Sequence, residues 1–95
     1  MAAPDLTEVQ TPAEFMGALR DYRALRGKPG YRIMADRCHQ AYTATPLRDA
    51  LIADDLPHLP MLRAILDGLQ ATQPDHAAFI RAWHRLTELT GGTPS

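Results

Sequence analysis

The hydrophobic residues of this chain recur at the three- and four-residue spacing of amphipathic helices, and no stretch alternates like a half-buried strand. Five segments carry the helical spacing. The first begins with Thr11-Pro12-Ala13-Glu14, in which Thr11 is placed to accept a bond from the third helical amide while Glu14 reaches back. Pro12 suits the first turn of a helix, and Gly27 is placed to end it. The pattern therefore predicts a first helix that starts just after Thr11.

The five helical faces supply the expected hydrophobic core. The large residues that we expect to be buried are Phe15, Leu19, Tyr22, Met34, Leu47, Leu51, Leu62, Ile65, Leu66, Phe79, Trp83 and Leu86. The same faces also include Ala18, Leu25, Tyr31, Ala35, Cys38, Ala50, Leu69, Ala82 and Leu89. The aromatic content is only 6%, so aliphatic side chains fill most of this core.

The remaining boundaries follow from caps and prolines. Thr45 followed by Pro46 predicts the start of the third helix, with Thr45 as the cap. The stretch 56–60 is expected to be extended, because each of its two prolines disfavours helix in the preceding residue. The fourth helix should end near Gly68 and the fifth should start near Pro74.

The chain has 95 residues, enough for one small domain. We expect a compact all-α domain of five helices over residues 11–89, with a disordered segment at 1–10 and a disordered tail at 90–95. The sequence holds no apolar run near the roughly 18 residues of a membrane span, and its start lacks a basic segment followed by an apolar stretch, so we expect no secretory signal. A single cysteine, Cys38, excludes an internal disulfide, so we expect a cytoplasmic protein.

The net charge of −1 conceals an uneven distribution. From Arg20 to Arg48 there are seven basic residues against two acidic ones, and the rest of the chain has three basic residues against nine acidic ones. Two interpretations remain open. The basic block either faces the phosphates of a nucleic acid or covers the solvated faces of amphipathic helices.

Two short helical segments, from Tyr31 to about Gln40 and from Thr45 to about Ala53, have the dimensions of a helix-turn-helix. Short sequence motifs also favour a helix-turn-helix. Thr-Pro-Ala-Glu-Phe from residue 11, Gly-Tyr-Arg from 30, Thr-Pro-Leu-Arg-Asp-Ala-Leu from 45 and Leu-Pro from 56 resemble an actinobacterial helix-turn-helix domain. That domain belongs with the lambda-repressor-like (xenobiotic-response-element type) regulators, and the resemblance covers residues 11–89.

The resemblance implies that the third helix enters the major groove of double-stranded DNA. Thr45, Arg48 and Asp49 would lie on its outward face, with Arg48 as the main reader of base edges. Arg32 would contact a phosphate, and Arg37 would belong to the same basic surface. The protein would then be a small DNA-binding transcriptional regulator, expected to act as a homodimer that reads two half-sites.

The chain departs from the family pattern at four positions. Ile52, Ala53 and Asp55 stand where the pattern carries arginines, and Ile33 replaces a residue that is usually polar. These changes remove phosphate contacts and add two apolar residues that we expect near the surface. They favour an alternative function, in which the helix-turn-helix fold is an adaptor that docks a protein partner through Ile33 and Ile52 without binding DNA.

Catalytic and metal-binding patterns receive no support. His76 and His84 are eight positions apart and Cys38 is adjacent to His39, so no i, i+4 pair of metal ligands is present. There is no nucleophile–base pairing and no glycine-rich phosphate loop. We therefore expect neither an enzyme nor a bound metal or cofactor.

Overall fold

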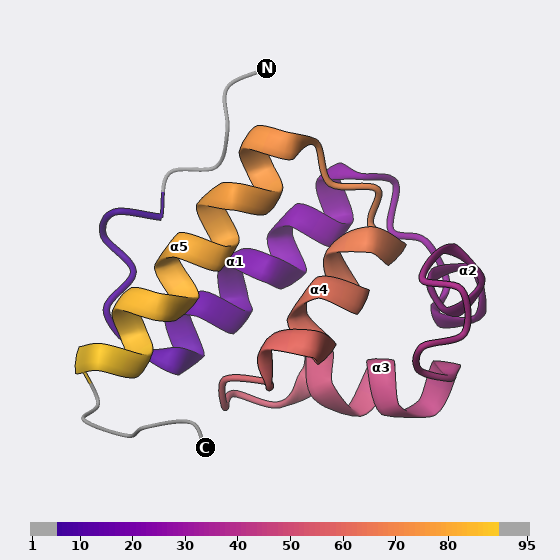
Figure 1. Ribbon diagram of the computed structural model, residues 1–95, viewed down its shortest axis with the longest axis horizontal. Coiled ribbons are helices and arrows are strands. Elements are labelled where there is room, and N and C mark those ends of the chain that lie inside the picture. Colours follow the sequence, from indigo (N-terminus) through magenta and orange to yellow (C-terminus); the bar gives the residue numbers. More distant parts are fainter. Residues whose placement is uncertain (1–5, 90–95) are drawn as a thin grey trace.

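The computed structural model describes residues 6–89, and within this range the chain is a compact all-α domain of five helices without a strand (Figure 1). This confirms the expected fold class. Our expectation of disorder at residues 1–5 and 90–95 lies outside the described residues. The helices are α1 (Pro12–Leu25), α2 (Tyr31–Arg37), α3 (Ala44–Ile52), α4 (Leu59–Gly68) and α5 (Gln73–Leu89).

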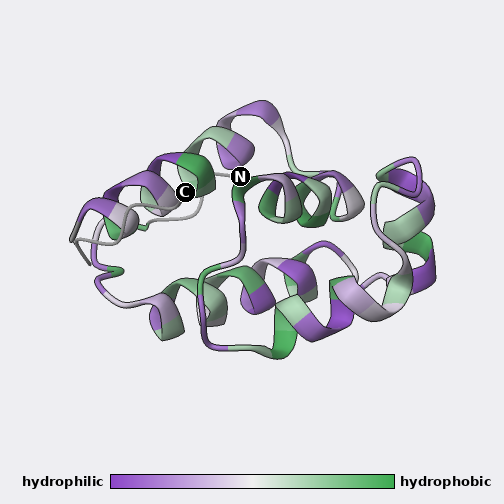
Figure 2. Cartoon of the chain, turned by 60° about the horizontal axis from the view of Figure 1, so that its bottom comes forward, coloured by the Kyte–Doolittle hydropathy of each residue, from purple (hydrophilic) through white to green (hydrophobic). Residues whose placement is uncertain are grey.

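Helix α4 lies at the centre of the arrangement. It packs against α2, α3 and α5, while α1 packs against α3 and α5 (Figure 1). Hydrophobic and hydrophilic residues alternate along the helices, as expected where one face of each helix is buried (Figure 2). Helices α2 and α3 therefore form one end of the domain, and the α1–α5 pair forms the other.

All twelve large residues that we expected in the core are buried. Phe79 of α5 packs edge-on against Phe15 and Tyr22 of α1, with ring centroids 5.9 and 5.3 Å apart. The indole N–H of Trp83 donates a hydrogen bond of 2.8 Å to the carbonyl of Pro57. Trp83 therefore belongs to the core and also holds the loop between α3 and α4.

The capping box at the start of α1 is confirmed. The hydroxyl of Thr11 accepts a hydrogen bond of 3.1 Å from the amide of Glu14. The carboxylate of Glu14 accepts one of 3.0 Å from the amide of Gln10, one residue before the cap. At the other end, Gly27 follows the helix with φ +91°, a conformation that glycine adopts without steric cost.

Three predicted boundaries are wrong. Helix α2 ends at Arg37 and not near Gln40, because His39 and Gln40 take left-handed backbone conformations. Helix α3 begins at Ala44 with Thr43 in the cap position, so Thr45 lies inside the first turn. Helix α4 begins at Leu59, and Pro60 stands in its first turn. A proline there removes no helical hydrogen bond, because the first amides of a helix have no intrahelical partner. Only residues 53–58 separate the two helices.

The N-terminal segment is a further correction. We expected disorder up to residue 10, but Leu6 is buried in the core. The guanidinium of Arg85 in α5 donates hydrogen bonds to the carbonyls of Leu6, at 2.7 Å, and of Val9. Residues 6–10 lack helical spacing, and their contacts come from a residue about 80 positions away, so local sequence does not reveal them.

Leu25 does not belong to the buried face of α1, because its side chain is 67% exposed. Met16, a residue that we expect to fill the core, is fully buried. The centre of the buried stripe is therefore rotated toward Met16, which leaves Leu25 beyond the opposite edge of the stripe. The side chain of Leu89, which we placed loosely on the α5 face, is outside the described part of the structure.

Candidate functional site

Helix α3 presents one continuous outward face. Thr45, Arg48 and Asp49 are exposed on it at positions i, i+3 and i+4. On the opposite side of the helix, Leu47 and Leu51 are fully or almost fully buried. Because these two leucines hold the helix against the core, the three polar side chains are presented from a fixed backbone.

Arg48 and Asp49 are neighbours on this face and form an ion pair, with 3.3 Å between Nη2 and Oδ1. Both side chains are more than half exposed. Exposed ion pairs of this kind contribute at most about 1 kcal/mol, so the pair gives way easily to a better partner. The guanidinium of Arg48 is thus available for an incoming ligand.

Helix α2 precedes this face and contributes Arg32, which is exposed and makes no hydrogen bond or ion pair with the described residues. The connection to α3 contains no glycine. His39 and Gln40 instead take left-handed backbone conformations, with φ of +57° and +59°. These two residues supply the sharp change of direction that a glycine supplies in many helix–helix turns.

Arg37 is not free to join Arg32 and Arg48. Its Nη1 donates a hydrogen bond of 3.0 Å to the carbonyl of Gly68, at the C-terminal end of α4. Its side chain is half-buried there. Of the three arginines that we expected on one basic surface, Arg37 therefore supports the fold, while Arg32 and Arg48 remain exposed.

Three more arginines of the basic block bind backbone carbonyls. Arg20 donates to Leu51 and Ala53 at the end of α3, at 2.9 and 3.1 Å. Arg26 donates to Leu69 and Gln70 just after α4, at 3.2 and 3.1 Å.

Arg23 donates to Pro29 at 2.8 Å and lies over the ring of Tyr31, with 4.4 Å from the guanidinium to the ring centroid. In all, four of the seven basic side chains between Arg20 and Arg48 bond to backbone carbonyls within the fold.

A signal for part of this arrangement exists in the sequence. The last turns of α3 and α4 contain no basic residue of their own. Helix C-termini leave carbonyls without intrahelical donors, and cations stabilise that end of the helix dipole. Arginines elsewhere in the chain are then the natural donors, although the sequence does not say which ones.

The charge that remains on the α2–α3 surface is nearly balanced. Asp36 and Asp49 are exposed there beside Arg32 and Arg48. Just after α3, the carboxylate of Asp54 pairs with Arg20 at 2.8 Å. The basic block of the sequence therefore does not become a basic surface in the fold.

Two isoleucines lie exposed on the same helices. Ile33 of α2 is 50% exposed and Ile52 of α3 is 60% exposed. Ile52 also borders a cavity of about 280 Å³ between α1, α2 and α3, which Lys28 and Tyr31 help to line. We expected both isoleucines near the surface, and each is at least half exposed.

Two other titratable side chains, those of Tyr22 and Cys38, serve the fold. Burial, followed by a hydrogen bond to Asp75, raises the pKa of Tyr22 above its ordinary value near 10. The phenol donates this bond at 2.6 Å and thereby ties α1 to the first turn of α5. The thiol of Cys38 is buried and donates to the carbonyl of Ala35 at 3.3 Å.

Comparison with known proteins finds no family model, curated protein or solved structure that matches this chain. Within residues 6–89, no three histidine, cysteine or acidic side chains come close enough together to hold a metal ion. None of the described helices combines the length and apolar character that crossing a membrane requires. The α2–α3 surface is therefore interpreted from its own geometry and from the resemblance of the sequence.

Proposed function

We propose that this domain binds double-stranded DNA and acts as a small transcriptional regulator. One observation carries the proposal: Thr45, Arg48 and Asp49 are all exposed on one face of α3, and buried leucines anchor the other face. These are the positions at which the resemblance to lambda-repressor-like domains implies contact with DNA. In this proposal α2 and α3 act as a helix-turn-helix, with α3 in the major groove.

The roles of the side chains follow from their chemistry. Arg48 is suited to a bidentate bond with O6 and N7 of a guanine, and Asp49 to accept a bond from N4 of a cytosine. Thr45, in the first turn of α3, is placed for a phosphate or for a thymine methyl group. Arg32 supplies a phosphate contact from α2.

Most arginines of the basic block are bonded within the fold, so we expect DNA binding to depend only weakly on salt concentration. Each phosphate contact contributes a slope of about −0.9 to the dependence of log K on log salt concentration. Arg20, Arg23, Arg26 and Arg37 are bonded to carbonyls, and Arg48 is assigned to a base edge, so Arg32 is the arginine of α2 and α3 that is left for a phosphate. We therefore expect a slope of about −1 per protein copy from arginine contacts.

Fluorescence anisotropy with a labelled library of random duplexes tests the proposal. At about 50 mM salt, a concentration at which phosphate contacts are strong, wild-type protein should bind. Arg48→Ala should weaken binding to the selected sequences by about 1–3 kcal/mol and relax the preference at one base pair. Arg81→Ala on α5 is the matched control and should bind like wild type. The absence of any binding at low salt would overturn the proposal.

A second candidate function rests on Ile33 and Ile52. Two large apolar side chains, each at least half exposed and both on the α2–α3 end, favour a protein partner over a phosphate backbone. In this case the fold is an adaptor that does not bind DNA. Ile52→Asp should then abolish partner capture and leave the fold intact, since the side chain is already exposed. Tight DNA binding that survives Ile52→Asp would exclude the adaptor.

The proposal includes two further expectations. A homodimer would let two copies of α3 read two half-sites one helical turn apart. A cytoplasmic location fits a regulator of transcription and a chain with one buried cysteine. Size-exclusion chromatography with light scattering, with and without duplex, measures the oligomeric state.

A further inference from the structure

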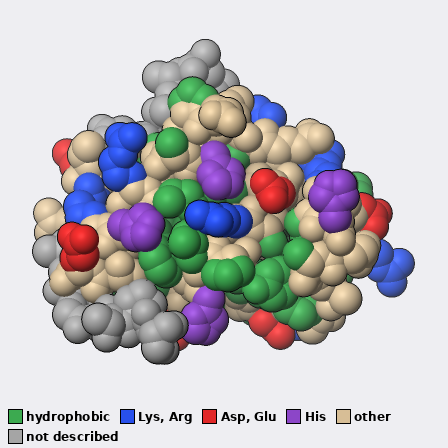
Figure 3. Space-filling model, viewed as in Figure 1, with side chains coloured by type: hydrophobic (Ala, Val, Ile, Leu, Met, Phe, Trp, Pro, Cys, Tyr) green, Lys and Arg blue, Asp and Glu red, His purple; other side chains and the backbone are tan. Residues whose placement is uncertain are grey.

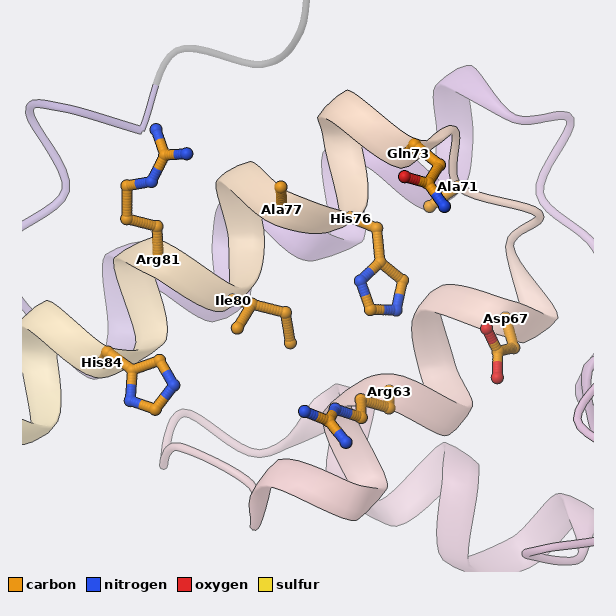
Figure 4. A pocket seen from close by; sticks show the side chains of 9 residues that line it. All are labelled: Arg63, Asp67, Ala71, Gln73, His76, Ala77, Ile80, Arg81 and His84. Atoms are coloured by element: carbon orange, nitrogen blue, oxygen red, sulfur yellow. The ribbon is translucent and has the colours of Figure 1, made fainter.

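A second surface lies between α4 and α5, on the face of the molecule shown in Figure 3. It is an open groove of about 710 Å³. Figure 4 shows Arg63 of α4 at one wall of the groove, with His76, Ile80 and His84 of α5 along the opposite wall. On the space-filling surface, histidine side chains surround a basic side chain among hydrophobic ones (Figure 3).

Arg63 differs from the arginines that hold the fold together. It is exposed and makes no hydrogen bond or ion pair with any described residue. Asp67 lies one turn further along α4 and also lines the groove, but the two side chains form no ion pair. Arg63 therefore holds a positive charge at the groove wall that forms no ion pair with a described residue.

The opposite wall has a regular pattern. His76, Ile80 and His84 follow one another at intervals of four residues, so they form a single row along α5. At 1.5 Å per residue, the two histidines are about 12 Å apart along the helix. Ile80 is half-buried and lies between them as an apolar contact point.

We propose that this groove binds an acidic peptide segment of a protein partner. Carboxylates would accept bonds from the imidazoles of His76 and His84 and from the guanidinium of Arg63, and an apolar side chain would rest on Ile80. In an extended peptide, residues i, i+2 and i+4 share one face and span about 13 Å. The spacing on α5 therefore matches the pattern Glu-x-Leu-x-Glu.

Two features favour a peptide over other anionic ligands. Arg63 and His84 are exposed and the groove is open to solvent, whereas small-molecule sites enclose most of the ligand. Asp67 at one end would repel a continuous phosphate backbone. A peptide can place a neutral or basic residue opposite Asp67. This requirement at one end of the groove also sets the direction in which the peptide binds. This site is separate from the proposed DNA-binding surface.

Fluorescence polarisation with a labelled, end-blocked peptide Glu-Ser-Leu-Ser-Glu tests the inference. Two controls have matched length: Gln-Ser-Leu-Ser-Gln, which lacks the charges, and Ser-Glu-Glu-Leu-Ser, which keeps the composition but breaks the spacing. At about 50 mM salt, a condition that favours charge pairing, the first peptide should bind saturably and each control at least about tenfold more weakly.

Variants then locate the site. Arg63→Glu should raise the Kd of the peptide by at least about tenfold, since a like charge replaces an opposite one. Arg63→Gln, which keeps a hydrogen-bond donor without the charge, should raise it several-fold. Lys28→Glu, in the connection between α1 and α2 and outside the groove, is the charge-matched control with unchanged binding. Circular dichroism checks that each variant is folded.

Four results would overturn the inference: no saturable binding, equal binding of the scrambled peptide, a folded Arg63 variant that binds like wild type, or duplex DNA that displaces the peptide and itself requires Arg63.

Discussion

Arginine side chains of this domain have two roles that the sequence alone does not separate. Arg37 and Arg32 are five positions apart on α2, yet Arg37 binds the end of α4 while Arg32 makes no hydrogen bond or ion pair within residues 6–89. The bond of Arg37 joins residues 31 positions apart, and that of Arg26 to Leu69 joins residues 43 apart. Such pairs depend on how the helices pack, so charge counting along the chain overestimates the basic surface.

This division predicts different effects of two similar substitutions. Arg37→Ala removes the donor to the carbonyl of Gly68 and should lower the free energy of unfolding by about 1–2 kcal/mol. Arg32→Ala, on the exposed side of the same helix, should change it by less than about 0.5 kcal/mol. Urea denaturation measures both. Equal stability of the two variants would show that the bond of Arg37 does not support the fold.

The hydrogen bond between Tyr22 and Asp75 predicts an effect of alkaline pH. Because the folded state raises the pKa of Tyr22, the contribution of the phenol is fully present below pH 10 and is lost as the pH rises through the raised pKa. Tyr22→Phe should therefore lower stability at pH 7 by about 1 kcal/mol. The difference between wild type and variant should shrink above pH 10. A difference that stays constant from pH 8 to 11 would contradict this.

At the scale of the elements, the helices themselves follow from the sequence better than their ends. Four-residue spacing of apolar residues is a local pattern, and it identified all five helices. The cap at Thr11 was also predicted, since its partner Glu14 is three residues away. The starts of α3 and α4 were not, because Thr43 caps without a side-chain bond and Leu59 enters the helix although it precedes a proline.

The contact between α2 and α4 depends on a glycine. A Cβ atom at Gly68 would lie 2.6 Å from Cβ of Met34 and 3.0 Å from its Cα, which is closer than atoms can pack. The absence of a side chain at position 68 therefore allows the two helices to approach. The sequence does not reveal this packing requirement, because from the sequence Gly68 indicates only that the fourth helix ends nearby.

Two glycine substitutions should consequently have opposite effects. Gly68→Ala should destabilise the domain by about 1–3 kcal/mol, because α2 and α4 must move apart. Gly17→Ala in α1 meets no atom within 4 Å and should stabilise it by about 0.5–1 kcal/mol, the usual gain in a helix interior. Thermal unfolding of both variants measures this. Stabilisation by Gly68→Ala would refute the close contact.

For the whole molecule, the sequence predicted the fold class and the core but only part of the candidate site. The resemblance of the sequence implied that Thr45, Arg48, Asp49, Ile33 and Ile52 lie at the surface. All five are exposed, because the buried residues of α2 and α3 turn these positions outward. The role of Arg37 and the groove around Arg63 depend on the packing of separate helices, so local spacing does not reveal them.

The fold thus presents two separate candidate surfaces, the outward face of α3 and the groove between α4 and α5. With both proposed functions, the domain would bind DNA through α3 and a protein partner through the α4–α5 groove. Because α4 packs against both α3 and α5, it connects the two surfaces structurally.

Chemical-shift mapping of the ¹⁵N-labelled protein against a duplex selected from the random library tests the central proposal most directly. At low salt, we expect the backbone amide shifts to change along α3 around Thr45, Arg48 and Asp49 and at the start of α2 around Arg32, with α5 unaffected. A spectrum that does not change on addition of duplex, or changes confined to the α4–α5 groove, would contradict DNA recognition by α3.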